Sequence, residues 1–232
     1  MTNRITQVAT CVSLTSGNYC SMRKIKDIPA CNIGIGTFAD LDGELMLVDG
    51  QYYQLRYDGN AYIPEPDAGT PFAVCADFQP TLHIDIPNPI DLATLQSVIN
   101  AALPEHNLPI MFRVNAEFET VHYRSIPKQG EEFVPFPEVI KNQSQFHDEN
   151  VSGVLVGFRF PQYFSAFNLV GYHIHYIDQE RKRGGHILGL KIKSGRIDLA
   201  ESSDFNLLLP GDNHKFTSSD LSSKSPVSFN SK

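Results

Sequence analysis

Charge is sparse in this sequence of 232 residues, and positive charge is the scarcer kind. Charged side chains make up 19% of the chain, and 26 acidic residues against 19 basic ones give a formal net charge of -7. Proteins that gather nucleic acid or anionic lipid present clustered positive charge. The composition argues against polyanions as partners, and we expect neither nucleic acid nor a membrane to be bound.

Long apolar runs are also absent. The N-terminal segment MTNRITQVATCVSLTSGNYC lacks the run of about 7 to 15 apolar residues, preceded by basic ones, that marks a secretory leader. No later stretch approaches the roughly 20 apolar residues of a membrane-spanning helix. These absences lead us to expect a cytoplasmic protein.

Cysteine is scarce and scattered. The four cysteines are Cys11, Cys20, Cys31 and Cys75, and they stand too far apart for the paired spacing of a zinc knuckle. Thiols in a reducing compartment ordinarily remain free. We therefore expect free cysteines and no metal site built from them.

Turn signals organise the first half of the chain. Asp-Gly recurs three times in GTFADLDGELMLVDGQYYQLRYDGNAYIP, and this dipeptide between short apolar runs is typical of tight hairpins. The pattern predicts a β-meander over residues 37–63, followed by a buried strand in TPFAVCADFQP. The apolar spacing of DLATLQSVINAAL predicts a helix near residues 91–103 with Asp91 as its N-cap.

Strand patterns dominate the remainder. They occur in IMFRVNAEFETVHYRSIP, VSGVLVGFRF, NLVGYHIHYI and GGHILGLKIKSGRIDLA, and a loop rich in Pro, Gln and Glu near residues 130–145 separates the first from the others. We expect an α+β fold of two packed domains built on mixed or antiparallel sheets with few helices. Residues 1–138 would form an N-terminal β-rich domain, and residues 139–232 a C-terminal β domain ending in a Ser-rich tail that is mobile unless something docks it.

Histidine is concentrated in one place. Three of the eight histidines fall in GYHIHYIDQERKRGGHILG. Side chains alternate along a strand, so His173 and His175 share a face. The polar segment DQERKRGG is typical of a hairpin loop, and a hairpin symmetric about residues 180 and 181 places His175 opposite His186. Cross-strand neighbours stand about 4.5 to 5.5 Å apart at Cβ, so all three rings can reach one ion.

Three imidazoles suit Zn²⁺ with a fourth position open to water or substrate, the arrangement of a catalytic site on a β-hairpin. Taken alone, a His-x-His pair in a strand is usually a surface feature or a hydrogen-bonded pair, and with the third histidine the pattern leaves both interpretations open. A cupin site fits poorly. The glycines and asparagine of the two cupin motifs are replaced by Phe167, Ile187 and Leu190.

The histidine segment, together with GTFADLDGELMLVDGQYYQL, TPFAVCADF, YRSIPKQ and GVLVGFRFPQY, resembles bacterial α-acetolactate decarboxylase over residues 31–190. The first thirty residues and the Ser-rich tail resemble it poorly. The resemblance implies a zinc-dependent carboxy-lyase, commonly dimeric, that converts 2-acetolactate to acetoin and CO₂ in acetoin and butanediol formation. Its site would lie between two domains.

Site roles follow from the same resemblance. It implies that His173, His175 and His186 hold Zn²⁺, that Arg124 in YRSIP faces the substrate, and that Glu44 in LDGEL is a catalytic carboxylate. These residue types suit the chemistry, because a guanidinium fork pairs with a carboxylate and a glutamate moves protons. Without the resemblance, Arg124 is better explained as a surface arginine at a strand end, and Glu44 as an ordinary exposed glutamate after a turn.

Two further residues complete the expected site. Thr37 in GTF is a candidate for a substrate contact, although threonine is also ordinary in a strand. The family places a glutamate from its C-terminal tail in the site, whereas this chain has no glutamate after Glu201, and Asp220 is the candidate replacement. The alternative hypothesis is therefore a catalytically weak relative that binds zinc and a hydroxy-keto acid.

Overall fold

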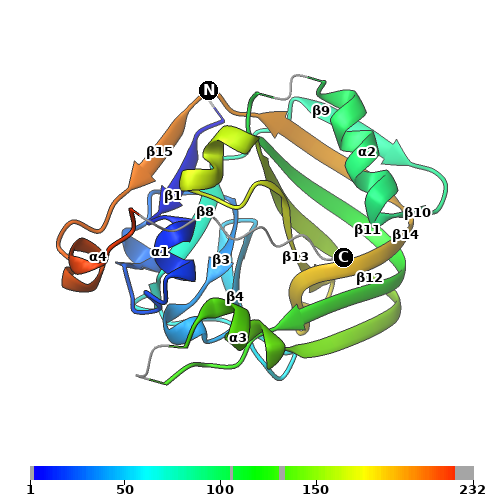
Figure 1. Cartoon of the computed structure of the whole chain (residues 1–232). Coiled ribbons are helices and arrows are strands. Elements are labelled where there is room, and N and C mark those ends of the chain that lie inside the picture. Colours follow the sequence, from blue (N-terminus) through cyan, green and yellow to red (C-terminus); the bar gives the residue numbers. More distant parts are fainter. Residues whose placement is uncertain (1–2, 105–106, 131–133, 223–232) are drawn as a thin grey trace.

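The computed structural model describes residues 3–104, 107–130 and 134–222, and its strands form two large sheets packed against each other (Figure 1). The first has seven strands in the order β15-β1-β8-β3-β4-β5-β6. Their bounds are β1 (Ile5–Val8), β3 (Ile33–Thr37), β4 (Glu44–Val48), β5 (Gln51–Leu55), β6 (Ala61–Tyr62), β8 (Phe72–Ala76) and β15 (Phe205–Leu208). All pairings are antiparallel except that of β1 with β15.

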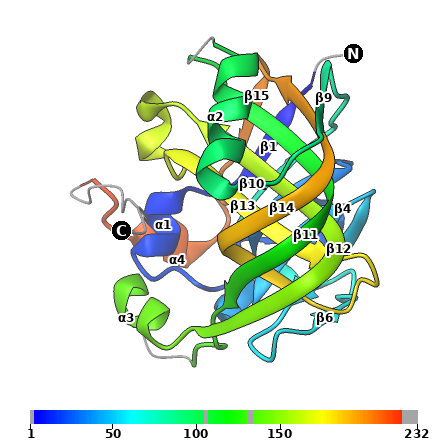
Figure 2. The same cartoon turned by 90° about the vertical axis from the view of Figure 1, so that its right-hand side faces the viewer.

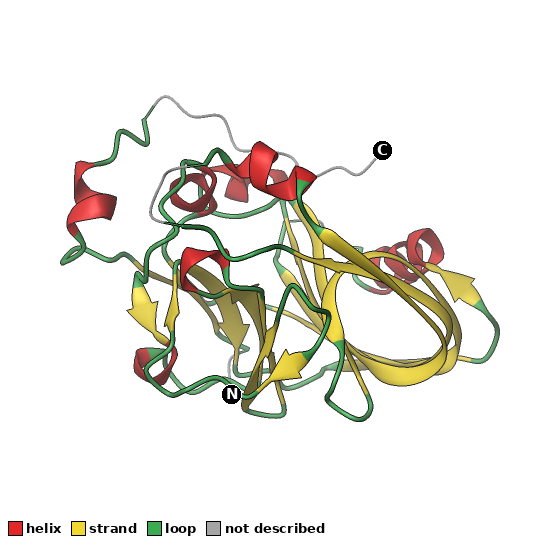
Figure 3. Cartoon of the chain, turned by 90° about the horizontal axis from the view of Figure 1, so that it is seen from below, coloured by secondary structure: helices red, strands yellow, loops and turns green. Residues whose placement is uncertain are grey.

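The second sheet is built from long strands in the order β10-β14-β11-β12-β13, with β9 also paired to β14. Their bounds are β9 (Leu82–Ile86), β10 (Ile90–Asp91), β11 (Ile110–Ser125), β12 (Ser144–Phe160), β13 (Gly171–Asp178) and β14 (Gly184–Glu201). At one end β13 pairs with both β12 and β14, so the sheet curls round and closes on itself (Figures 2 and 3). This closure brings the two strands with the histidines side by side.

Three apolar cores hold these layers together. One lies between the sheets and joins residues of β3 and β4 to residues of β12, such as Val156 and Phe158. A second fills the curl of the larger sheet beneath helix α2 (Leu92–Ala102), which contributes Leu95 and Ile99. A third covers the outer face of the smaller sheet. Because both sheets contribute to the first core, they are one packing unit.

The short elements complete the smaller sheet and its edges. A ribbon of β2 (Arg23–Lys24) and β7 (Gly69–Thr70) lies beside it, and helix α1 (Cys11–Thr15) follows β1, with Thr10 capping its N-terminus. The other helical segments are η1 (Ile25–Asp27), η2 (Ala39–Leu41), α3 (Phe136–Lys141), η3 (Gln162–Ala166) and α4 (His214–Ser218). No helix among the described residues is long and apolar enough to span a bilayer.

Most of the predicted elements are present. Strands β4, β5 and β6 form the meander predicted from the Asp-Gly turns, and β8 is the predicted buried strand. Helix α2 begins after Asp91, whose side chain accepts a hydrogen bond from the backbone N–H of Thr94 at 2.8 Å. The predicted mainly β architecture with few helices is therefore confirmed.

The boundary expected at residue 138 lies in a connection between two strands of the larger sheet. Strands β11 and β12 pair along almost their whole length, so residues 126–143 form a connection within one sheet, and it contains α3. The chain passes from the first sheet to the second between Ala76, the end of β8, and Leu82, the start of β9. After β14 the chain returns to the first sheet, where β15 pairs with β1.

The segment after Pro210 is better ordered than its composition suggests. Helix α4 lies beside α1 (Figure 1), and the Asn213 side chain that caps it also donates to the carbonyl of Ser21 at 3.0 Å. Asn18 and Ser219 are hydrogen bonded at 3.0 Å. Residues 214–219 are thus docked by these hydrogen bonds, which is the case in which the tail was not expected to be mobile, and residues 223–232 lie outside the described part of the chain.

Close packing at the histidine hairpin predicts a stability cost for Gly185→Ala. A methyl group at this position would collide with the carbonyl oxygen of Arg124 and lie 2.9 Å from the Tyr123 ring. Overpacking of this kind costs about 1 to 3 kcal/mol. Urea unfolding should show this loss, whereas Gly211→Ala, with nothing within 4 Å of the added methyl, should stay close to wild type. Equal midpoints for the two variants would contradict the packing described here.

Candidate metal centre

The three histidines of β13 and β14 converge at the seam of the larger sheet. His173 and His175 lie on one face of β13, and His175 is directly opposite His186 in the register of β13 and β14. One ring nitrogen from each histidine lies within 4.8 Å of those from the other two. The hairpin register predicted from the sequence is therefore present, and it brings the three rings together.

A backbone carbonyl orients the central imidazole. His175 is fully buried, and its Nδ1 lies 2.9 Å from the carbonyl oxygen of Leu45 in β4. A carbonyl only accepts hydrogen bonds, so Nδ1 carries the proton and Nε2 of the neutral ring presents a lone pair. That Nε2 lies 3.1 Å from Nε2 of His173. The smaller sheet thus fixes the ring orientation in a histidine of the larger one.

Burial keeps the three rings neutral. It lowers the pKa of His173 to about 3, with a smaller contribution from the charge of Arg124. Burial likewise lowers the pKa of His175 and His186 well below the ordinary histidine value. Neutral imidazoles are the form that ligates metals. Three such donors, with Nδ1 of His173 and of His186 lacking a hydrogen-bond partner among the described residues, fit a divalent cation such as Zn²⁺.

An ion pair lies against the histidines. Glu44 begins β4 and Arg124 lies near the end of β11, opposite His186. Nη1 of Arg124 donates to Oε1 of Glu44 at 2.9 Å, and Oε2 of Glu44 lies 3.8 Å from Nε2 of His175. Each side chain of the pair is only 7% exposed. The two residues that sequence alone did not distinguish from surface residues are therefore buried together at the candidate metal centre.

The protonation of Glu44 reflects two opposing effects. Burial raises the pKa of this carboxyl group, and the hydrogen-bonded charge of Arg124 lowers it, with burial the larger. Desolvation of a carboxylate is costly unless its partners replace the lost water. A buried glutamate whose pKa is raised toward neutrality suits a group that gives and takes a proton.

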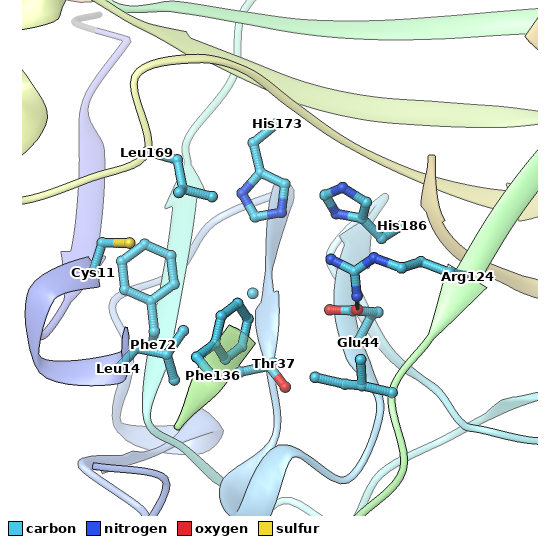
Figure 4. A pocket seen from close by; sticks show the side chains of 12 residues that line it. Cys11, Leu14, Thr37, Glu44, Phe72, Arg124, Phe136, Leu169, His173 and His186 are labelled. Atoms are coloured by element: carbon cyan, nitrogen blue, oxygen red, sulfur yellow. Dashed lines mark hydrogen bonds and ion pairs between the residues drawn. The ribbon is translucent and has the colours of Figure 1, made fainter. Parts of the chain in front are cut away.

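The rest of the pocket is mainly apolar. Figure 4 shows His173, His186, Arg124 and Glu44 on one side and Cys11, Leu14 and Phe72 facing them across the cavity. Ile126, Phe136 and Leu169 complete the apolar lining. Burial raises the pKa of the Cys11 thiol to about 12, so it is a neutral wall residue. Sequence reasoning missed this wall because its residues come from separate, distant segments with no shared motif.

Thr37 and Asp220 differ in their relation to the pocket. Thr37 lines it, and its hydroxyl donates to the carbonyl of Gly43 at 2.7 Å. Asp220 is exposed and is not among the described residues that line the cavity. Its carboxylate accepts from the backbone N–H of Ser222 at 3.0 Å and from the Ser222 hydroxyl at 2.6 Å.

The lowered histidine pKa values predict how pH affects the metal-free protein. Unfolded histidine titrates near about pH 6.5, whereas folded His173 resists protonation until about pH 3. Its contribution to stability is therefore complete above pH 6.5 and is lost as the pH falls from there toward 3. Urea unfolding of metal-free protein should show a pH slope steeper than that of His173→Gln by up to about 1.4 kcal/mol per pH unit. Identical slopes would show that His173 titrates normally.

Comparison with known proteins identifies the family. The family model described as alpha-acetolactate decarboxylase matches residues 5–223, so the similarity extends well beyond residues 31–190. An alpha-acetolactate decarboxylase of Methylococcus capsulatus is 37% identical over 179 residues, which are 77% of this chain and 69% of that protein. One of Klebsiella aerogenes is 36% identical over 209 residues, 90% of this chain and 80% of that protein.

A solved structure shares the architecture. The crystal structure of alpha-acetolactate decarboxylase from Bacillus subtilis strain 168 superposes with a TM-score of 0.91 at 34% sequence identity, covering 94% of each chain. Sequence and fold therefore agree along nearly the whole chain, from β1 to the segment after α4. The chain belongs to the alpha-acetolactate decarboxylase family of carboxy-lyases.

Proposed function

We propose that this protein catalyses zinc-dependent decarboxylation of 2-acetolactate to acetoin and CO₂, a step of acetoin and butanediol formation, in the cytoplasm and as a homodimer. One observation carries the proposal: the three neutral histidines and the buried Glu44–Arg124 ion pair share a single pocket. The names of the relatives give the substrate. His173, His175 and His186 are the proposed metal ligands.

Decarboxylation requires a group that stabilises the electron pair left behind when the bond to the carboxylate breaks. Loss of CO₂ from a 2-hydroxy-3-oxo acid leaves an enediolate, so negative charge develops on the former ketone oxygen. Zn²⁺ bound by the three histidines supplies Lewis acidity toward that charge. The apolar wall of Leu14 and Phe72 excludes water and accommodates the methyl groups of the substrate.

Arg124 binds and orients the departing group. Its hydrogen bond to Glu44 uses Nη1, and the guanidinium carries further N–H groups that can bind the substrate carboxylate. When the carboxylate leaves as neutral CO₂, the charge of Arg124 again acts mainly on Glu44. Glu44, once it has taken up a proton from solvent, gives that proton to the carbon that lost CO₂ and returns to the carboxylate that the charge of Arg124 stabilises. Arg124 thus first holds the substrate and then stabilises the deprotonated acid.

Thr37 has a secondary proposed role. Because its hydroxyl proton is directed at the Gly43 carbonyl, the oxygen can only accept a hydrogen bond from a ligand in the pocket. The substrate hydroxyl is such a donor. Thr37 would therefore orient the substrate without taking part in proton transfer.

The tail supports a second candidate function. No glutamate follows Glu201, and Asp220 is exposed and hydrogen bonded to Ser222. Loss of a group that supports proton transfer typically costs about 10²- to 10⁴-fold in rate. A protein of this kind would bind zinc and a hydroxy-keto acid with little turnover. Stoichiometric zinc without acetoin above the spontaneous background would favour this alternative over the decarboxylase.

The metal ligands predict the behaviour of His175→Ala. Removing the ring oriented by Leu45 should abolish both bound zinc and acetoin formation, because two imidazoles hold the ion much more weakly. Elemental analysis and an acetoin assay with racemic acetolactate measure the two effects. His214→Ala, a change in the exposed helix α4, is the matched control and should keep both. Full zinc content in His175→Ala would exclude His175 as a ligand.

The proton-transfer role predicts that Glu44→Gln retains zinc and loses activity. The amide keeps the shape of the side chain but cannot exchange the proton, so kcat should fall by about 10²- to 10⁴-fold. Circular dichroism at the assay temperature verifies folding, since Arg124 loses its charged partner. The control is Glu149→Gln, an exposed glutamate of β12, which should leave kcat unchanged. A Glu44→Gln enzyme with wild-type kcat would rule out the assigned role.

A further inference from the structure

Two cysteines far apart in the sequence meet on the outer face of the smaller sheet. Sγ of Cys31 lies 2.8 Å from Sγ of Cys75, 44 residues along the chain, and both are free thiols. Cys31 is half-buried just before β3, and Cys75 is buried within β8. The sulfurs are thus in contact, and neither cysteine is among the residues that line the pocket of the proposed active site.

The backbone beside Cys31 is held firmly against β8. The amide side chain of Asn32 donates to the carbonyl of Phe78 at 2.9 Å and accepts from the backbone N–H of Phe78 at 2.8 Å. The backbone N–H of Asn32 also donates to the carbonyl of Ala76 at 2.9 Å. These bonds fix the position of Cys31 relative to Cys75, so little conformational entropy is left to lose when the sulfurs react.

Glycine makes room for the buried partner. Gly34 lies opposite Cys75 in the register of β3 and β8, and a Cβ atom on Gly34 would lie 2.8 Å from the Cβ of Cys75. The absence of a side chain there leaves space beside Cys75 on the β3 side, whereas its neighbour on β1 is Thr6. Cys31, three residues before Gly34 in the sequence, places its sulfur next to that of Cys75.

We propose that Cys31 and Cys75 are a redox modification site, which low-molecular-weight disulfides such as oxidised glutathione convert to a reversible intramolecular disulfide. The thiolate of Cys31 attacks one sulfur of the small disulfide, forming a mixed disulfide and releasing one thiolate. Cys75 then loses its proton and attacks the Cys31 sulfur, displacing the second thiolate. The two cysteine sulfurs give up two electrons in all, and the small disulfide is reduced to two thiols.

The order of attack follows from exposure. Cys31 is the more accessible thiol and meets the oxidant first. The hydrogen bond with Cys31 and burial both raise the pKa of Cys75, so its thiol stays protonated until the neighbouring sulfur becomes electrophilic. An external reductant reverses the sequence by attacking the exposed Cys31 sulfur.

The crosslink encloses the catalytic strands of the smaller sheet. Residues between Cys31 and Cys75 include β3, β4 and β5, and hence Thr37 and Glu44. Closing a loop of this length reduces the entropy of the unfolded chain. Oxidation should therefore raise the thermal midpoint of unfolding by about 5 to 10 °C.

The test uses the full-length protein incubated with oxidised glutathione or with dithiothreitol. Free thiols are counted on the denatured protein, and non-reduced peptides are examined by mass spectrometry. We expect the count to fall from four to two, with a Cys31–Cys75 crosslinked peptide that reductant removes and a raised thermal midpoint. Cys20→Ser, at a half-buried cysteine whose sulfur accepts from the Asn213 side chain, should still form the crosslink, whereas Cys31→Ser should not.

Three outcomes would overturn the proposal. These are four free thiols after oxidation, a glutathione adduct on Cys31 that never resolves, and a crosslink that involves Cys20. The wild-type peptide measurement stands even if Cys75→Ser, at a buried position, fails to fold. None of these readouts depends on zinc or on decarboxylase activity.

Discussion

A short length of strand pairing organises this molecule. Strand β13 pairs with β14 through only three residue pairs, of which His175 and His186 are the first. Those pairs close the larger sheet on itself and place the histidines on its outer face, toward β4 of the smaller sheet. The same contact that closes the fold therefore creates the candidate metal centre, and a change that opens the seam disperses the site.

The smaller sheet supplies what the larger one cannot. The His175 ring points away from the interior of the larger sheet, so its orientation must be fixed by a group outside that sheet. The Leu45 carbonyl of β4 accepts a hydrogen bond from Nδ1 of His175 and fixes the ring. The next residue back, Glu44, meets Arg124 from the larger sheet. Two adjacent residues of β4 thus act on neighbouring parts of the site, Glu44 through its side chain and Leu45 through its backbone carbonyl. Burial between the sheets then removes water from all of them, which keeps the imidazoles neutral.

Local sequence patterns are enough to predict part of the candidate metal centre. The histidine register follows from strand alternation and the symmetry of a hairpin loop, and both are properties of neighbouring residues. The meeting of Glu44 and Arg124 is different, because 80 residues separate them and each is ordinary in its own segment. Only the family resemblance singled them out. The segment around residue 138 is a related case, because a loop rich in Pro and Glu does not reveal that the strands flanking it pair with each other.

The return of β15 to β1 has a consequence for biosynthesis. Ile5 pairs with Phe205, so one edge of β1 stays unpaired until a strand 200 residues downstream has been synthesised. At about 5 to 20 residues per second, a ribosome takes roughly 10 to 40 s to make that partner. During this interval the nascent chain presents an unpaired strand edge, the kind of surface that recruits other chains. Strand β15 thus caps an edge that is open to aggregation until it has been made.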